Sequence, residues 1–493
     1  MNVSVSSDKS DPRCSSSASK AALNAKNKDI IRHPNITSVR SLAELLTFRT
    51  LISSSTKSEH ENLLAHEDAQ AAPCGSSFSS SSPFSAIVIS NNEDLLIQIL
   101  LFLPPKSLIR FHCVSKQWRA LVSSPLFCRL HLQKNRTISS TAAEAGLFLY
   151  RRKYENSELH AIPICHDSSP AMGMITSRIV NFLDMEGEIL AFDSCNGLTF
   201  IDFYLNNEIR RYYIYNPTTN HYRLIPQPQI GAESRTITAV NIVFDPLKSD
   251  EYRLVCVLSK AVLHVREGKE YYFLVYSSEA GVWKECMDVD TEGIHYYHFN
   301  QGVYWNGNLY WKTSNRSLLC FDLEHDCVRK MKMATTDQSS SPPPHTLVIL
   351  YFGESGGNLH LIDQFEPQES FIHIRELELE LGLGRYHSRW LLKHQVDIGF
   401  LTARYPLMVN KRFPAHNGNQ FVFKIPCFLV DRKENKAKMM ISLRGKIIFY
   451  EINGGSIEEL VEIEPANLQF LGYYMSLYSW KHAFKHFETL ACV

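Results

Sequence analysis

Two hydrophobic patterns divide this chain. Between Asn91 and Phe127, apolar residues recur at helical spacing and are interrupted by Pro104 and Pro105. From about residue 146 to the end, short apolar runs rich in Val, Ile, Tyr, Phe and Trp alternate with Gly, Asn, Asp and Pro. The first pattern predicts three short helices, and the second predicts many antiparallel strands.

The helical segment carries its own start and stop signals. Asn91 is expected to cap the first helix, and Pro105 suits the first turn of the second. Ser115 is expected to cap the third helix, which ends before Pro125. About forty residues are too few to bury this much apolar surface alone. Part of the surface must therefore face a partner or the rest of the chain.

The strand-rich region contains a weak repeat. In each copy an apolar strand ends in an aromatic residue or Ile, a short polar turn follows, and a second strand begins. Copies recur at intervals of roughly 45 to 75 residues. Steps near 45 to 60 residues suit one four-stranded propeller blade each, and longer steps suit insertions. They align on Tyr215, Tyr276, Phe321, Ile374 and Tyr450. An irregular β-propeller is therefore expected, with a pair of β-sandwiches as the alternative. Residues 473–487 are expected to close the domain as a short amphipathic segment.

Turn chemistry supports the strand assignment. Asn306 and Gly307 separate two aromatic strands and predict a tight primed turn. Asn196-Gly197, Gly356-Gly357 and Asn453-Gly454 mark similar bends. The Pro-Ser tract at residues 339–344 predicts an exposed loop between strands.

Composition narrows the class of protein. The 493 residues carry a formal net charge of +0, so nothing global indicates a nucleic-acid or membrane partner. Apolar runs are too short for a transmembrane helix, and the start lacks a secretory signal. Twelve scattered cysteines without a C-x-x-C pair predict reduced thiols and a location in the nucleus or cytoplasm. The Ser-rich residues 1–85 are expected to form a disordered tail, with a transient helix after Ser41.

Three motifs invite a catalytic or metal-binding interpretation, and each has a simpler one. Residues 353–357 match G-x-S-x-G, but a second strand follows where a nucleophile elbow needs a helix, which favours a hairpin turn. His482 and His486 lie four apart on a possible helix, without the Glu of a zinc protease. A third set, Cys320, His325 and Cys327, lacks a fourth ligand. The sequence therefore predicts no enzyme, no metal and no cofactor. Most tryptophans in the region, Trp283, Trp305, Trp311, Trp390 and Trp480, are expected to pack between blades.

The helical segment closely resembles the plant F-box motif. Asp-Leu-Leu, Leu-Pro-x-Lys-Ser-Leu and Cys-Val-Ser-Lys-x-Trp occur in order and at the usual spacing between residues 93 and 125. F-box proteins dock on a Skp-type adaptor and bring substrates to a cullin-RING ubiquitin ligase. The family usually begins with Leu-Pro where this chain has Asn91 and Asn92, so weaker adaptor binding is expected. The resemblance implies an adaptor interface made by Leu95, Ile99, Leu103, Pro104, Leu108, Val114 and Trp118.

The strand region resembles plant F-box-associated domains at residues 194–198, 215–219, 244–249 and 304–307. In that family the C-terminal domain is propeller-like and holds the substrate. After the disordered tail that composition predicts at 1–85, the resemblance implies an F-box module at 86–136 and a substrate-receptor domain at 146–493. The chain would then be the non-catalytic substrate-recognition subunit of a ubiquitin ligase, with a target protein that the sequence does not identify. A propeller scaffold without an adaptor, and an enzyme or glycan-binding lectin, are the alternatives.

Overall fold

The fold is that of a computed structural model, and Asn92 is the first residue that it describes. It describes residues 92–138, 144–152, 157–163, 175–176, 187–205, 209–231, 234–261, 269–286, 299–313, 317–332, 346–366, 370–382, 385–410, 420–421, 423–432, 434–443, 446–462 and 482–493. The predicted tail at residues 1–85, the predicted helix after Ser41, the tract at 339–344 and Trp480 lie outside these residues.

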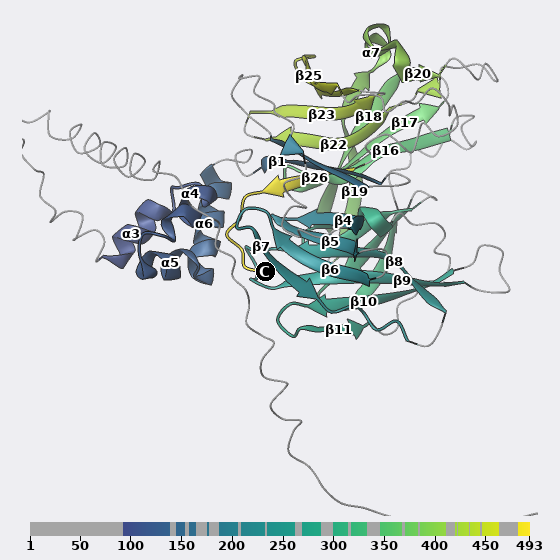
Figure 1. Cartoon of the computed structure of the whole chain (residues 1–493). Coiled ribbons are helices and arrows are strands. Elements are labelled where there is room, and N and C mark those ends of the chain that lie inside the picture. The colour runs from purple at the N-terminus through teal and green to yellow at the C-terminus, as the bar shows by residue number, and fades with distance from the viewer. Residues whose placement is uncertain are drawn as a thin grey trace, which may run out of the picture. The chain divides into compact units, whose positions relative to one another are not determined.

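The helical segment forms four helices, one more than predicted (Figure 1). Asn92 caps the first helix, one residue after the predicted cap, and its side-chain oxygen accepts from the Leu95 N–H at 3.2 Å. The predicted roles of Pro105 and Ser115 are confirmed, and the Ser115 hydroxyl accepts from the Trp118 N–H at 3.1 Å. The helices are α3 (Glu93–Leu100), α4 (Pro105–Phe111), α5 (Lys116–Val122) and α6 (Pro125–Ile138). The proline that ends the third predicted helix thus also begins the fourth.

A six-bladed β-propeller follows, and each blade is a four-stranded antiparallel sheet. Blade 2 contains β4 (Gly187–Cys195), β5 (Leu198–Leu205), β6 (Ile209–Asn216) and β7 (His221–Ile225). Blade 3 contains β8 (Arg235–Phe244), β9 (Tyr252–Ala261), β10 (Lys269–Ser277) and β11 (Val282–Glu285). Blade 4 contains β12 (Val303–Trp305), β13 (Asn308–Lys312), β14 (Ser317–Asp322) and β15 (Cys327–Lys332), preceded by the short helix η1 (Phe299–Gln301).

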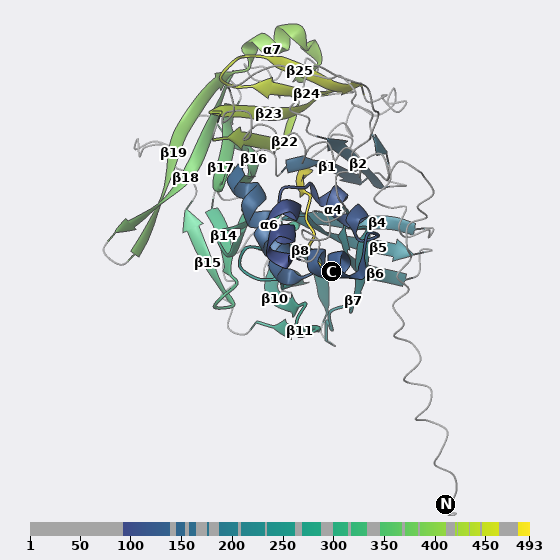
Figure 2. The same cartoon turned by 90° about the vertical axis from the view of Figure 1, so that its left-hand side faces the viewer.

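The remaining blades follow the same plan. Blade 5 contains β16 (Thr346–Ser355), β17 (Asn358–Glu366), β18 (Phe371–Gly382) and β19 (Arg385–Asp397). Blade 6 contains β22 (Lys424–Asp431), β23 (Lys436–Leu443), β24 (Lys446–Glu451) and β25 (Ile457–Glu462). Between them lie α7 (Gly399–Arg404), η2 (Pro406–Met408) and the paired strands β20 (Val409–Asn410) and β21 (Gln420–Phe421). The turned view shows the blades spread around a common centre (Figure 2).

Blade 1 is built from both ends of the region. Its order is β26 (His482–Phe487), β1 (Glu144–Arg152), β2 (Ser157–Pro163) and β3 (Ile175–Thr176). The last strand of the chain therefore pairs with the first and closes the ring. The possible helix that carried His482 and His486 is wrong, because both residues lie in strand β26. His486 packs against Phe148, with ring centroids 4.8 Å apart, which makes it part of the blade packing.

The predicted propeller is confirmed, and the β-sandwich alternative is wrong. All five aligned repeat residues lie in the third strand of a blade, in β6, β10, β14, β18 and β24. Apolar faces pack between neighbouring sheets, as with Phe273, Trp311 and Phe321 between blades 3 and 4. Blade 1 left no repeat in the sequence because its strands are supplied by two distant segments.

The predicted hairpin turns depend on backbone conformations with positive φ. Asn306 and Gly307 have φ of 47° and 85°, which confirms the primed turn between β12 and β13. Gly197 has φ +95°, and a Cβ there would lie 2.5 Å from the Phe487 carbonyl oxygen. Only glycine therefore allows the β4–β5 turn to approach the C-terminal segment. At the predicted bend after Glu451, the residue with positive φ is Gly455.

Candidate functional site: the helical module and its attachment

The four helices share a small apolar core. Six of its buried side chains come from the helices themselves: Leu96, Leu100, Leu108, Leu121, Val122 and Phe127. The seventh, Leu490, comes from the C-terminal segment, residues 488–493. We call α3–α6 the helical module. Its core is too small to hide every apolar side chain, so several remain at the surface.

The seven residues of the implied adaptor interface differ in exposure. Leu95 and Val114 are exposed, at 41% and 46%, and Pro104 is also exposed. Ile99, Leu103 and Trp118 are half-buried. Leu108 is fully buried inside the module, so it supports the surface from beneath. These positions describe a surface with a supporting layer, and the contact with an adaptor stays a prediction.

Phe102 is an exposed aromatic residue that the sequence reasoning did not place at the interface. It follows the end of α3 and is 68% exposed. The Lys134 ammonium group lies over its ring, 3.0 Å from the ring centroid. A hydrophobic ring left at the surface of a small module marks a contact site. Its position directly before Leu103 and Pro104 is the signal that would have identified it.

The segment after α3 is fixed to α6 by a hydrogen bond. His131 is buried, and its Nε2 lies 2.7 Å from the Leu103 carbonyl oxygen. Burial lowers the pKa of His131, so the ring is neutral near pH 7 and Nε2 donates its proton to the carbonyl. Trp118 is fixed in a similar way, because its ring meets Phe111 edge to face at 5.5 Å. The Leu103 backbone and the Trp118 ring therefore have defined orientations.

The C-terminal segment attaches the helical module to blade 2. On the module side, the Cys128 thiol donates to the Leu490 carbonyl at 3.5 Å, and Lys106 pairs with Glu488 at 2.5 Å. On the blade side, the Asn216 amide donates to two carbonyls of the same segment, those of Thr489 at 3.1 Å and Ala491 at 2.8 Å. Burial raises the pKa of Cys128 to about 12, so this thiol is a structural donor and not a reactive group.

Comparison with known proteins agrees with this arrangement. Residues 92–130 match the F-box domain, and residues 150–374 match the F-box associated beta propeller domain. F-box only protein 8 of Arabidopsis thaliana is 31% identical over 252 residues, which cover 49% of this chain and 79% of that protein. This chain belongs to the F-box protein family.

Two further F-box proteins of Arabidopsis thaliana match over most of their length. One is 26% identical over 395 residues, covering 78% of this chain and 88% of the relative. The other is 24% identical over 366 residues, covering 72% and 91%. The similarity therefore spans both the helical module and the propeller of this F-box protein. Within the part of the chain that the structure describes, no helix has the length and apolar character needed to cross a membrane.

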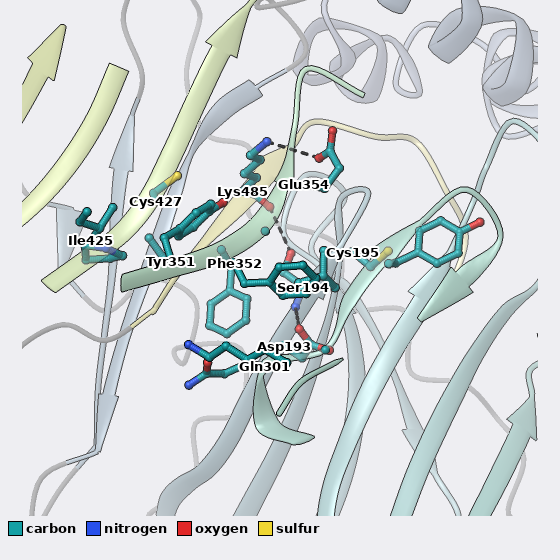
Figure 3. A pocket seen from close by; sticks show the side chains of 18 of the residues that line it. Asp193, Ser194, Cys195, Gln301, Tyr351, Phe352, Glu354, Ile425, Cys427 and Lys485 are labelled. Atoms are coloured by element: carbon teal, nitrogen blue, oxygen red, sulfur yellow. Dashed lines mark hydrogen bonds and ion pairs between the residues drawn. The ribbon is translucent and has the colours of Figure 1, made fainter. Parts of the chain in front are cut away.

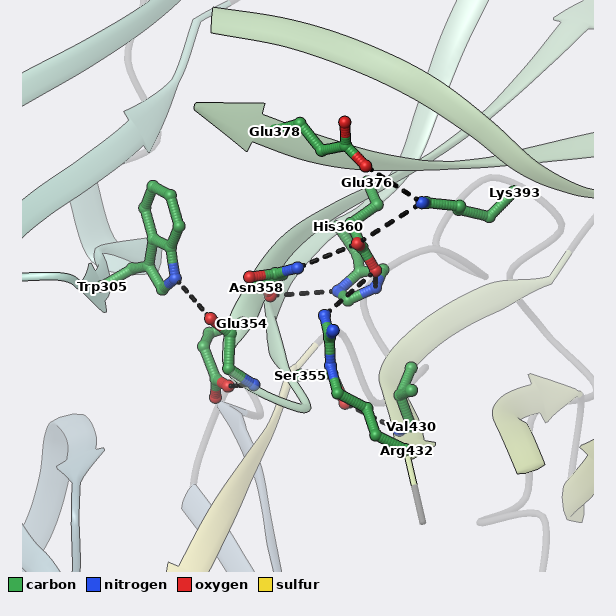
Figure 4. Close-up of polar contacts among 11 residues, drawn as sticks. Trp305, Glu354, Ser355, Asn358, His360, Glu376, Glu378, Lys393, Val430 and Arg432 are labelled. Carbon is green, nitrogen blue, oxygen red and sulfur yellow. Dashed lines mark hydrogen bonds and ion pairs between the residues drawn. The ribbon is translucent and has the colours of Figure 1, made fainter. Parts of the chain in front are cut away.

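The G-x-S-x-G motif of this F-box protein is the predicted hairpin turn between β16 and β17. Ser355 is fully buried, and its hydroxyl accepts from the Val430 N–H of blade 6 at 2.8 Å (Figure 4). On the other side, the Trp305 indole of blade 4 donates to the Gly357 carbonyl at 2.8 Å. The motif therefore joins three blades and leaves no hydroxyl facing a substrate.

A polar network beside this turn joins blades 5 and 6 (Figure 4). Glu376 accepts from Asn358 at 2.8 Å, from His360 at 3.2 Å and from Arg432 at 3.3 Å, and Lys393 lies 3.7 Å away. Burial alone would raise the pKa of Glu376, but these donors and cations hold it below the ordinary value. Burial lowers the pKa of His360 to about 4, so its ring is neutral near pH 7. We interpret the network as a structural link between blades 5 and 6, because its side chains bond to one another.

The proposed cysteine and histidine ligand set does not assemble. His325 places its Nδ1 3.0 Å from an Asp322 oxygen, and Arg329 holds the same oxygen at 2.8 Å. Cys320 is buried within β14. Across the described ranges, no group of three or more His, Cys, Asp or Glu side chains is arranged to hold a metal ion.

Proposed function

We propose that this F-box protein is the substrate-recognition subunit of a Skp-cullin-F-box ubiquitin ligase. The helical module docks on the Skp-type adaptor, and the propeller holds a target protein. The observation that carries this proposal is the set of exposed apolar side chains, Leu95, Phe102 and Val114, on a module that already has a core of its own. Exposing these apolar side chains to water is unfavourable, and a partner that covers them removes that free-energy cost.

The role needs no bond-making residue in this chain. Holding a target beside a charged conjugating enzyme raises its effective concentration, and that alone accelerates transfer. The packed and hydrogen-bonded connection from the helical module through the C-terminal segment to blade 2 suits this task, because it sets the distance over which ubiquitin must pass. The proposal places the protein in the nucleus or cytoplasm, where such ligases work.

A pull-down with a purified Skp-type adaptor tests the docking step. Leu95→Asp and Val114→Asp each place a charge in a contact that is dry when the adaptor is bound, so we expect at least tenfold weaker binding. Both side chains are exposed in the free protein, so the fold should be unaffected. Leu103→Asp is less informative, because Leu103 packs on the module core and its loss mixes folding with docking.

Val282→Asp is the matched control. Val282 is 59% exposed on β11 of the propeller, so the same change of charge leaves the module untouched. We expect it to bind the adaptor like wild type. If folded wild-type protein does not bind, or if the module variants bind as well as the control, the docking role is wrong. The affinity of the wild-type protein in the same assay also tests the effect of the missing Leu-Pro start. Asn92 caps α3 with its side chain and offers no apolar contact to an adaptor.

A further inference from the structure

The inner strands of the propeller enclose a central cavity of about 450 Å³ (Figure 3). Residues of β4, β8, β12, β16, β22 and β26 line it, so every blade contributes an inner strand. This volume lies within the range of roughly 300–1,000 Å³ that is typical of small-molecule sites. Because its walls are six strands, the cavity admits a small molecule and no folded protein.

The acidic groups of the cavity are already engaged. Asp193 accepts the N–H groups of Ser194 and Ile242, both at 2.9 Å, and burial raises its pKa to about 7. Glu354 pairs with Lys485 at 3.3 Å, and the two side chains point toward each other in Figure 3. These groups hold the blades together, and they leave little negative charge for the rest of the cavity.

Two lysines lie at one end of the cavity. Tyr310 pairs with Val303, the first residue of β12, so Lys312 lies beyond the start of that strand, at the level of Gln301. Lys424 is the first residue of β22. Both lysines therefore line the cavity where the inner strands begin. The helical module contacts the segment after β26, where an inner strand ends, so the lysine end is separate from the attachment.

The electrostatics of this end are unfavourable without a ligand. Lys312 is half-buried, and burial together with the charge of Lys424 lowers its pKa to about 8. Among the residues that the structure describes, no carboxylate lies within ion-pair distance of Lys312. A cation that has lost hydration and faces a like charge destabilises the protein, and an anion between the two would reverse that cost.

We propose that Lys312 and Lys424 form a binding site for a small organic anion that carries carboxylate or phosphate groups. Their ammonium groups bind the anion, and the Gln301 amide lies beside it as a polar group of the same wall. The site does not depend on adaptor docking, because it lies on other elements. An experiment can therefore reject the anion site without rejecting adaptor docking, and the reverse.

Thermal unfolding of the full chain tests the site with two probes, pyrophosphate for phosphate and citrate for carboxylate. Chloride at equal ionic strength is the reference. We expect one of the probes to raise Tm saturably, by about 1–3 °C at concentrations well above Kd. Calorimetric titration should give one site per chain. The probe that acts identifies which anionic group the site accepts.

Two variants and a control assign the effect to the lysines. Lys312→Met and Lys424→Met should each abolish the rise in Tm. Lys312→Met should also unfold at a higher temperature than wild type without any probe, because it removes an unpaired, desolvated charge. Lys269→Met, an exposed position on β10, should respond like wild type. A single cooperative unfolding transition in each variant shows that it is folded.

Four results would overturn the proposal. Neither probe raises Tm of the wild-type protein; the rise persists in both lysine variants; or Lys312→Met destabilises the protein without a probe. Binding of an acidic peptide without any response to pyrophosphate or citrate would also reject a small anion, and would assign the lysine end to a protein target.

Discussion

Leu490 gives a direct test of how the helical module is attached. It is 7% exposed and packs in the module core with residues such as Leu100 and Phe127. Replacing a buried leucine by alanine costs about 2–5 kcal/mol. Because Leu490 lies at the edge of this core, we expect Leu490→Ala to cost about 2–3 kcal/mol. The Cys128 hydrogen bond goes to the Leu490 backbone, so it survives the change and the loss is that of apolar packing.

A loss of about 2.5 kcal/mol shifts the balance between attached and detached module roughly 70-fold. Hydrogen exchange measured on peptides of α3–α6 should therefore become faster by about that factor, while β8–β11 exchange as before. Leu224→Ala is the control, since Leu224 is 50% exposed on β7 and its truncation should cost under about 0.5 kcal/mol. If the helices of Leu490→Ala keep wild-type protection, the C-terminal segment does not hold the module, and the reasoning from its burial is wrong.

Three further changes test the attachment and the blade contacts. Asn216→Ala removes both hydrogen bonds to the C-terminal segment and should destabilise the protein by about 2–3 kcal/mol in urea unfolding. Gly197→Ala combines positive φ with a clash at the Phe487 carbonyl and should cost about 2 kcal/mol or more. Glu376 has a lowered pKa, so its contribution is full above its ordinary pKa and is lost as pH falls through the lowered value. Glu376→Gln should therefore remove that part of the acid destabilisation below about pH 5.

Each of these predictions has a result that contradicts it. Equal urea midpoints for wild type and Asn216→Ala would show that water satisfies the two carbonyls as well as the Asn216 amide does. An unchanged midpoint for Gly197→Ala would mean that the β4–β5 turn relaxes without cost. If Glu376→Gln and wild type lose stability in parallel as pH falls, the network of Arg432 and Lys393 does not depend on that charge.

The propeller was predictable because five of its blades are contiguous in the sequence. The aromatic residue near the end of a third strand, such as Tyr215 or Tyr276, packs between sheets and is followed by a polar turn, which makes the repeat visible. Blade 1 was not visible, since strand pairing between β1 and β26 is a long-range property that no local pattern records. The fourth helix was missed because Pro125 was interpreted only as a stop.

Site residues were likewise predictable where a local sequence motif contains them, and not where only the tertiary fold brings them together. The F-box motif located the exposed Leu95 and Val114, but it did not distinguish them from Leu108, which the tertiary packing buries. The two cavity lysines, Lys312 and Lys424, had no sequence signal. They lie in different blades, and only closure of the ring brings them to the same cavity.

The closing strand β26 also sets the order of events during synthesis. Strand β1 leaves the ribosome first but lacks its inner partner until residues 482–487 have been made, so the nascent propeller carries an open strand edge through most of translation. Unpaired edges of this kind recruit other chains and need protection by chaperones. A premature stop codon before His482 would leave that edge exposed permanently and would also remove Leu490 from the helical module. Loss of residues 482–493 should therefore cause aggregation and degradation of the whole protein.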